Sequence, residues 1–67
     1  MEKLNRIKGY RVMIGITQEE MATEIGISLK GYTDKENGKS ALKTDELKKI
    51  QVVFKNHGLE TTIDELI

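Results

Sequence analysis

Hydrophobic residues recur every three or four positions along most of this chain, and that spacing predicts α-helices rather than strands. In the first segment, Leu4, Ile7, Tyr10 and Ile14 fall on one helical face. Residues 51–54 have a strand-like composition, but they lie inside a longer helical repeat. Five helices are expected: Lys3 to Ile14, Thr17 to the residue before Gly26, Leu29 to Glu36, Thr44 to about Phe54, and a short one opened by Thr62.

Polar residues at the expected helix starts and glycines at the expected ends support these boundaries. Thr17-Gln-Glu-Glu20 and Thr62-Ile-Asp-Glu65 have the spacing of a capping box, in which a hydroxyl and a carboxylate satisfy free backbone N–H groups. Ser28 and Thr44 are expected to cap the third and fourth helices. Four glycines follow helical segments and are expected to be left-handed: Gly15, Gly26, Gly38 and Gly58.

Composition favours a small all-α bundle. The chain has 67 residues, 37% of them hydrophobic, with no cysteine and no proline. We therefore expect one compact five-helix domain over residues 1–67 with a modest core. The residues expected to face that core are Met21, Ala22, Ile25, Leu47, Ile50, Val53 or Phe54, Ile63, Leu66 and Ile67.

Several function classes are disfavoured. The absence of cysteine excludes a disulfide scaffold and fits the reducing cytosol. No run approaches 18 apolar residues and the first residues lack the apolar region of a signal peptide, so a cytoplasmic protein is expected. His57 is the only histidine and is interpreted as a residue at a helix C-terminus. Neither an enzymatic site, a metal site nor a cofactor is predicted.

Charge is balanced overall but uneven along the chain. The net charge is zero, which argues mildly against a non-specific nucleic-acid coat protein. Residues 1–15 and 26–43 are basic in balance, whereas residues 16–25 contain acidic residues and no basic ones. This segregation predicts a basic stripe on one face, although it is equally typical of an ordinary mixed surface.

Residues 17–36 form the most informative segment, a short capped helix, a glycine turn and a second capped helix. Ala22 is small, as the close approach of two steeply crossing helices requires, and Gly26 tolerates a left-handed turn. Ile25, Ile27 and Tyr32 are placed to fill the corner. The pattern indicates a helix-turn-helix, whose second helix enters the major groove of DNA. Capped helices and glycine stops also occur in any small helical bundle.

In this register the chain resembles the Cro and phage-repressor type of helix-turn-helix protein, the XRE family. The segments that carry the resemblance are residues 14–22, 25–28, 36–39 and 62–66. It implies a five-helix, lambda-repressor-like DNA-binding domain that regulates transcription. It also implies binding to a two-fold symmetric operator as a dimer.

The resemblance assigns phosphate contacts to the start of the second and third helices and to the loop after the third. These residues are Gln18, Ser28, Asn37, Lys39 and Ser40. Free amides at a helix N-terminus favour an anion there on physical grounds as well. Three of them have a simpler interpretation: Gln18 as a solvated first-turn residue, Ser28 as a helix cap and Asn37 as a residue that favours a turn.

The third helix is the expected recognition helix, with Leu29, Lys30, Thr33 and Asp34 on its groove side. Lys30 is suited to guanine acceptors, Asp34 to the cytosine amino group and Leu29 to a thymine methyl. Thr33 is a candidate for either base or backbone. Alternatively, Lys30 is a solubilising surface lysine, and it is spaced to pair with Asp34.

Three further positions follow from the resemblance. Arg11 and Glu36 match a structural ion pair that ties the first helix to the end of the third. Lys35 stands where the family places an apolar residue, which predicts a looser recognition helix unless its stem packs. Gly31 lies inside that helix and costs it about 1 kcal/mol relative to alanine; it permits close approach to DNA or marks a helix that orders on binding.

The leading hypothesis is a phage-type transcriptional regulator, expected to be a repressor, that is nucleoid-associated when bound to operator DNA as a weak homodimer. The C-terminal third is the expected dimer surface, because Leu59, Ile63, Leu66 and Ile67 exceed the obvious needs of the core. Alternatively, these residues complete the core. The second hypothesis is an antitoxin-like or anti-repressor domain that binds protein, which zero net charge, Lys35 and Gly31 favour slightly.

Overall fold

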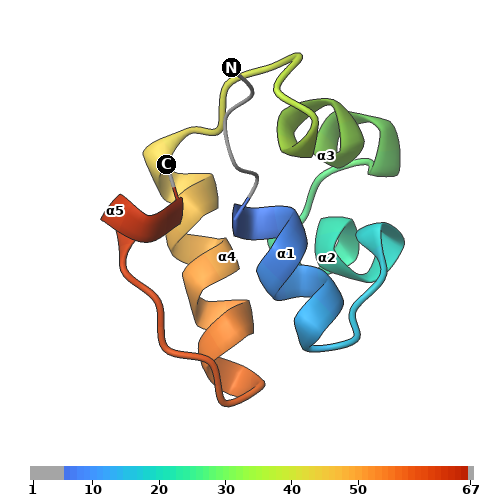
Figure 1. Ribbon diagram of the computed structural model, residues 1–67. Helices are drawn as coiled ribbons and strands as arrows, with labels where there is room; N and C mark the ends of the chain where they lie inside the picture. The colour runs from blue at the N-terminus through green and yellow to red at the C-terminus, as the bar shows by residue number, and fades with distance from the viewer. Residues whose placement is uncertain (1–5, 67) are drawn as a thin grey trace.

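The computed structural model describes residues 6–66, and all of its regular elements in that range are helices. They are α1 (Arg6–Met13), α2 (Gln18–Ile25), α3 (Leu29–Glu36), α4 (Thr44–Asn56) and α5 (Ile63–Leu66), shown in Figure 1. The all-α prediction and its five elements are therefore confirmed. The expected start of the first helix at Lys3, its residue Leu4 and the final Ile67 lie outside the described residues. None of the described helices has the length and apolar character needed to cross a membrane.

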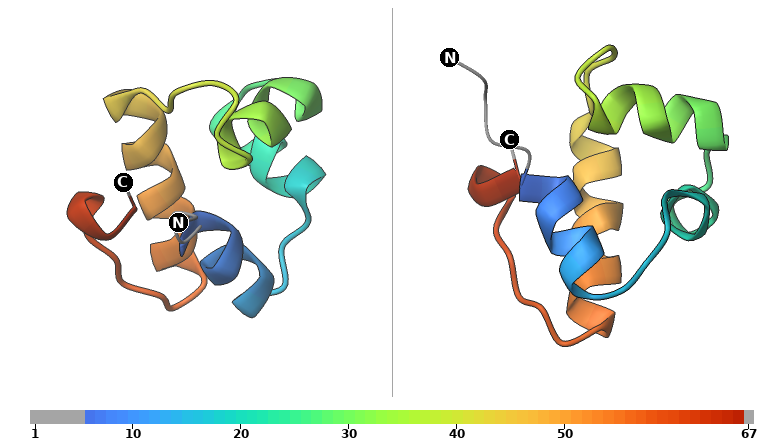
Figure 2. Two further views of the ribbon diagram at one scale, coloured as in Figure 1. Left: turned by 45° about the horizontal axis from the view of Figure 1, so that its top comes forward. Right: turned by 45° about the vertical axis from the view of Figure 1, so that its right-hand side comes forward.

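The longest helix, α4, stands at the centre of the arrangement. α2 packs against both α3 and α4, and α5 packs against α1 and α4. Tyr10 of α1 meets Phe54 of α4 edge to face, with ring centroids 5.8 Å apart. Figures 1 and 2 show α3 and α5 on opposite sides of α4. The surface around α3 is therefore remote from the C-terminal helix.

The core contains the residues that helical periodicity selected. Of the expected core residues, Met21, Ala22, Ile25, Leu47, Ile50 and Leu66 are buried, as are both Val53 and Phe54. Leu59 and Ile63 are half-buried and pack against the same cluster. The C-terminal apolar residues within the described range thus contribute to the core, as the alternative expected, and a dimer surface formed by the same residues stays a prediction.

Helix starts follow the capping chemistry, except that the cap of α4 lies one residue before its expected position; α1 ends at Met13 rather than Ile14, and α4 continues to Asn56. At Thr17 both halves of the capping box are present, and Ser28 caps α3 through the Gly31 N–H. Thr44 does not cap α4: it is the first helical residue, and Lys43 occupies the cap position. The reason is Glu46, whose carboxylate accepts the Lys43 N–H at 2.9 Å and satisfies the helix start one residue earlier.

The second expected capping box is formed only in part. The Thr62 hydroxyl accepts the Glu65 N–H at 3.2 Å, as expected. One Glu65 carboxylate oxygen accepts the Thr62 hydroxyl rather than the Thr62 backbone N–H, at 3.3 Å. The other accepts the Tyr10 hydroxyl at 3.1 Å, so Glu65 connects α5 to α1 instead of completing the box.

Candidate nucleic-acid interface

α2, α3 and the turn between them have helix-turn-helix geometry. Gly26 is left-handed, with φ +79°, and its N–H returns to the carbonyls at the end of α2. All four glycines expected to be left-handed have positive φ. Ala22 is 2% exposed on the inner face of α2, where bulk would force the helices apart, while Ile25 and Tyr32 are buried at the corner. Ile27 is half-buried against the same core. The predicted corner is confirmed.

A buried ion pair fixes the C-terminal end of α3. Arg11 Nε lies 2.8 Å from Glu36 Oε2 and Arg11 Nη2 lies 3.1 Å from Glu36 Oε1, a bidentate contact that confirms the predicted pair. The remaining guanidinium nitrogen donates to the Ile16 carbonyl at 2.6 Å. Glu36 also accepts from the Tyr32 hydroxyl and, at 3.0 Å, from Gln18 Nε2. A single carboxylate therefore joins α1, α2 and α3.

The network keeps Glu36 ionised despite its burial. Burial alone would raise the pKa of Glu36, but hydrogen bonds from Arg11, Tyr32 and Gln18 outweigh it and lower that pKa. Burial, reinforced by the hydrogen bond to Glu36, raises the pKa of the Tyr32 phenol. The carboxylate is thus a permanent anion at neutral pH, and α3 is held by charge as well as by apolar packing.

Gln18 has a structural partner in addition to its predicted phosphate. Its half-buried amide nitrogen donates one hydrogen to Glu36. A primary amide carries two N–H hydrogens, so one remains for an acceptor outside the protein. The network fixes where that second donor lies, at the first residue of α2. The interpretation of Gln18 as merely solvated is therefore wrong.

The side of α3 that faces away from the core presents both charge and apolar surface. Leu29 is 46% exposed and supplies the apolar part of this surface. The Lys30 ammonium lies 3.3 Å from the Asp34 carboxylate, which confirms the spacing-based pair, and the two side chains are 87% and 28% exposed. Thr33 is half-buried beside them. All four predicted base-reading residues lie on α3.

The loop after α3 folds back onto the end of that helix. The N–H groups of Lys39 and Ser40 donate to the Asp34 carbonyl at 2.8 and 3.3 Å. Asn37 ends the helix in a right-handed conformation and the left-handed Gly38 follows it. The side chains of Asn37, Lys39 and Ser40 are exposed. The loop therefore extends the outward surface of α3 with hydrogen-bond donors and one cation.

Lys35 and Gly31 both have structural explanations. The Lys35 ammonium pairs with the Glu46 carboxylate at the start of α4, so α3 is tied down rather than loosened. A Cβ on Gly31 would lie 3.0 Å from the Ser28 hydroxyl oxygen, which accepts the Gly31 N–H. Gly31 thus makes room for the helix cap. Sequence reasoning did not predict that Glu46 pairs with Lys35. The available signal was the spacing of Lys43 and Glu46, which is that of a helix cap and places the carboxylate at the start of α4.

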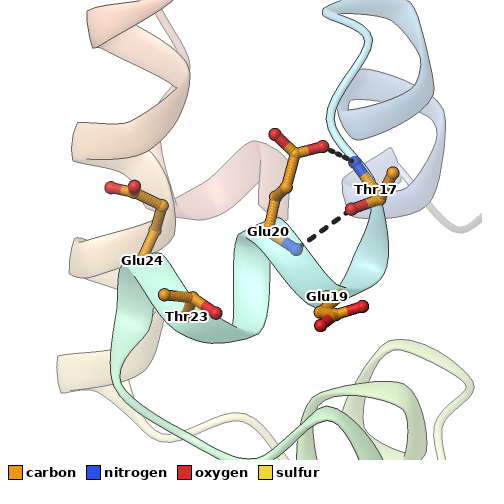
Figure 3. A pocket seen from close by; sticks show the side chains of 5 residues that line it. All are labelled: Thr17, Glu19, Glu20, Thr23 and Glu24. Carbon is orange, nitrogen blue, oxygen red and sulfur yellow. Dashed lines mark hydrogen bonds between the residues drawn. The ribbon is translucent and has the colours of Figure 1, made fainter.

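The outward face of α2 is acidic. A shallow hollow there is lined by Thr17, Glu19, Glu20, Thr23 and Glu24 (Figure 3). Hydrogen bonds from the Thr17 N–H and then its hydroxyl lower the pKa of Glu20, which keeps it charged. Three carboxylates repel phosphate. On electrostatic grounds this face is less suited to a phosphate backbone than the face of α3 and its loop.

A comparison with protein families supports this geometry. A helix-turn-helix family model matches residues 7–57, which include nearly all of α1 and the whole of α2, α3 and α4. The chain belongs to the Cro and phage-repressor type of helix-turn-helix family. No curated protein and no solved structure matches it. The chain is thus a DNA-binding helix-turn-helix domain of a kind found generally in transcription regulators, a family that is typically not enzymatic.

Proposed function

We propose that the protein is a sequence-specific transcriptional regulator, acting as a repressor of the phage type, that reads double-stranded operator DNA with α3. The observation that carries this proposal is the outward face of α3, where the exposed Leu29 and the Lys30–Asp34 pair stand on a helix fixed from beneath by Glu36. Side chains on a rigid helix are suited to reading base edges in the major groove.

Lys30 and Asp34 together match the edge of a G·C pair. Guanine presents acceptors O6 and N7 in the major groove, and cytosine presents an amino donor. A lysine and an aspartate one helical turn apart supply the complementary donor and acceptor. Leu29 then contacts a thymine methyl, and Thr33 a neighbouring base or the backbone. The proposed half-site therefore contains a G·C pair beside an A·T pair.

Phosphate contacts come from both ends of this surface. Gln18 and Ser28 stand at the N-terminal ends of α2 and α3, where free N–H groups and the helix dipole attract anions. Asn37, Lys39 and Ser40 follow the sugar–phosphate backbone from the loop after α3. These contacts supply affinity and register but no sequence information.

Selection from a randomised duplex library tests the function. The purified protein is incubated with duplexes randomised over about two helical turns, and the enriched sequences are then titrated by fluorescence anisotropy. We expect an inverted repeat whose half-sites contain a G·C pair, bound at least about 10³ times more tightly than random DNA. If no sequence is enriched, DNA reading fails as the function and a protein-binding, antitoxin-like role takes its place. Zero net charge is the one observation that still favours that role, since Lys35 and Gly31 now have structural explanations.

A further inference from the structure

The recognition helix has little apolar anchorage. Tyr32 is the one residue of α3 among the buried hydrophobic residues of the described chain. The other buried residue of α3 is the charged Glu36. Polar contacts at its C-terminal end therefore matter for the rotation of this short helix about its own axis.

Two adjacent residues provide such contacts in different directions. Glu36 binds Arg11 of α1, and Lys35 binds Glu46 of α4. Successive residues of an α-helix are turned by about 100° around its axis. Glu36 contacts α1 and α2, and Lys35 adds a contact to α4 in a different direction around the axis of α3.

Glu46 is itself held in place. One carboxylate oxygen accepts the Lys43 N–H at 2.9 Å, and the other pairs with Lys35. The side chains of Lys35 and Glu46 are 17% and 12% exposed, so water and salt screen the pair much less than they screen a surface pair. The ion pair therefore connects α3 to a rigid point, the first turn of α4.

We propose that Lys35 and Glu46 are positioning residues, which set the rotation of α3 and through it the base selectivity of the protein. This inference rests on the proposed function. Bidentate and base-edge contacts require placement within about 0.5 Å and 10–20°. Phosphate contacts tolerate more movement, because charge attraction has no sharp angular dependence. Loss of the Lys35–Glu46 tie should therefore reduce discrimination between sequences more than affinity for DNA in general.

The decisive variant is Glu46→Gln, which keeps a side-chain oxygen for the Lys43 N–H and removes the charge that holds Lys35. The matched control is Asp45→Asn, which removes the same charge from the neighbouring, exposed position of the same helical turn. Each protein is titrated with the duplex that the wild type enriches from the random library and with a scrambled duplex of equal length and composition. We expect Glu46→Gln to lower the ratio of the two affinities about tenfold or more. Binding to the scrambled duplex should change less than about twofold, and Asp45→Asn should leave the ratio unchanged.

A double variant separates positioning from stability. In Lys35→Met with Glu46→Gln, no unpaired ammonium remains beside α4, so the melting temperature should recover toward that of the wild type. Selectivity should stay low, because the directed contact between α3 and α4 is still missing. If selectivity recovers together with the melting temperature, the pair is merely structural and the inference is wrong. Equal loss on both duplexes in Glu46→Gln overturns it as well.

A measurement without DNA distinguishes failure of this inference from failure of the proposed function. Residual dipolar couplings of the amide N–H groups report the orientation of α3 relative to α2. We expect a reorientation of α3 in Glu46→Gln and none in Asp45→Asn. If the wild-type protein enriches no duplex, the proposed function fails, and these couplings alone decide whether the pair positions α3. An unchanged orientation in Glu46→Gln overturns the inference whatever the protein binds.

Discussion

Arg11 and Glu36 are 25 residues apart in the sequence, yet their side chains form a bidentate ion pair inside the protein, with Nε 2.8 Å from Oε2. The Glu36 side chain has no exposed surface and that of Arg11 is 9% exposed. Tyr32 and Gln18 also donate hydrogen bonds to the carboxylate. The helix proposed to read DNA is thereby connected to the helix at the start of the described chain.

Breaking this pair should be costly. Glu36→Gln leaves the Arg11 guanidinium buried without a counter-charge, and removing one partner of a buried pair costs about 3–5 kcal/mol. That is a large share of the free energy of unfolding, which is roughly 5–15 kcal/mol for a typical domain. Urea denaturation followed by circular dichroism measures the loss. Tyr32→Phe is the control, because it keeps the ring and removes one hydrogen bond to the charged group. It should lower the free energy of unfolding by only about 1.5–3 kcal/mol. A loss below about 1 kcal/mol in Glu36→Gln would contradict the structural role.

Acid should destabilise the protein through Glu36 and Glu46. Hydrogen bonds from Lys35 and from the Lys43 N–H lower the pKa of Glu46, and the buried network lowers that of Glu36, both from an ordinary value of 4.5. For a carboxylate with a depressed pKa, the stabilisation is fully present above the unfolded-state pKa and is lost as pH falls through the folded-state pKa. The urea concentration at the midpoint of unfolding should therefore be constant near neutral pH and should decrease once the pH is lowered below about 4.5.

The matched comparison is Glu46→Gln against Asp45→Asn over the same pH series. Glu46→Gln should show a smaller decline in acid, because one of the titrating groups is gone. Asp45→Asn should follow the wild type. A wild-type midpoint that rises on acidification would show that the two carboxylates are not stabilised in their charged form.

Features set by neighbouring residues were predictable from the sequence. The left-handed glycines, the Thr17 capping box and the Ser28 cap depend on the backbone within one helical turn, and all are confirmed. The core residues follow from helical periodicity for the same reason. The Arg11–Glu36 pair is a long-range contact, and it was predicted through the family resemblance rather than through local spacing.

The errors arose where a distant residue decides the outcome. Lys35 breaks the expected apolar pattern, and its partner Glu46 lies across a loop in the next helix. The cap of α4 is a local exception: Glu46 accepts the N–H of Lys43, three residues before it, so Lys43 rather than Thr44 occupies the cap position. The sequence also does not show that Leu59 and Ile63 pack against the core, because that depends on how the last helix packs.

Lys30→Ala should relax the base preference at one position of each half-site. The loss of a base contact costs about 1–3 kcal/mol on the preferred sequence and little on random DNA. Lys55→Ala is the control, since it removes the same charge from the last turn of α4, at the end remote from α3 in Figures 1 and 2. Anisotropy titrations on single-base variants of the enriched duplex give the result. A uniform loss on every duplex would assign Lys30 to a phosphate instead.

Lys39→Ala should weaken binding equally on enriched and scrambled duplexes. Its exposed ammonium lies in the loop after α3 and is proposed to contact a phosphate. Each neutralised phosphate contributes close to one unit to the slope of log K against log salt. The slope should therefore be about one unit shallower in the variant. An unchanged slope would remove Lys39 from the interface, and Lys55→Ala again serves as the charge-matched control.

The protein should bind a full operator as two copies. One domain presents a single short recognition helix and few cations, which is too little for the affinity of about 10⁻⁸ M or tighter that is typical of specific sites. Two copies on half-sites about one helical turn apart multiply the discrimination between operator and random DNA. The enriched sequence should therefore be an inverted repeat. The protein–protein contact is expected to be weak, because Leu59, Ile63 and Leu66 are largely engaged by the core. Analytical ultracentrifugation with half-site and full-site duplexes measures the stoichiometry. If one copy binds the full site as tightly as two, the homodimer is excluded and a single domain does the reading.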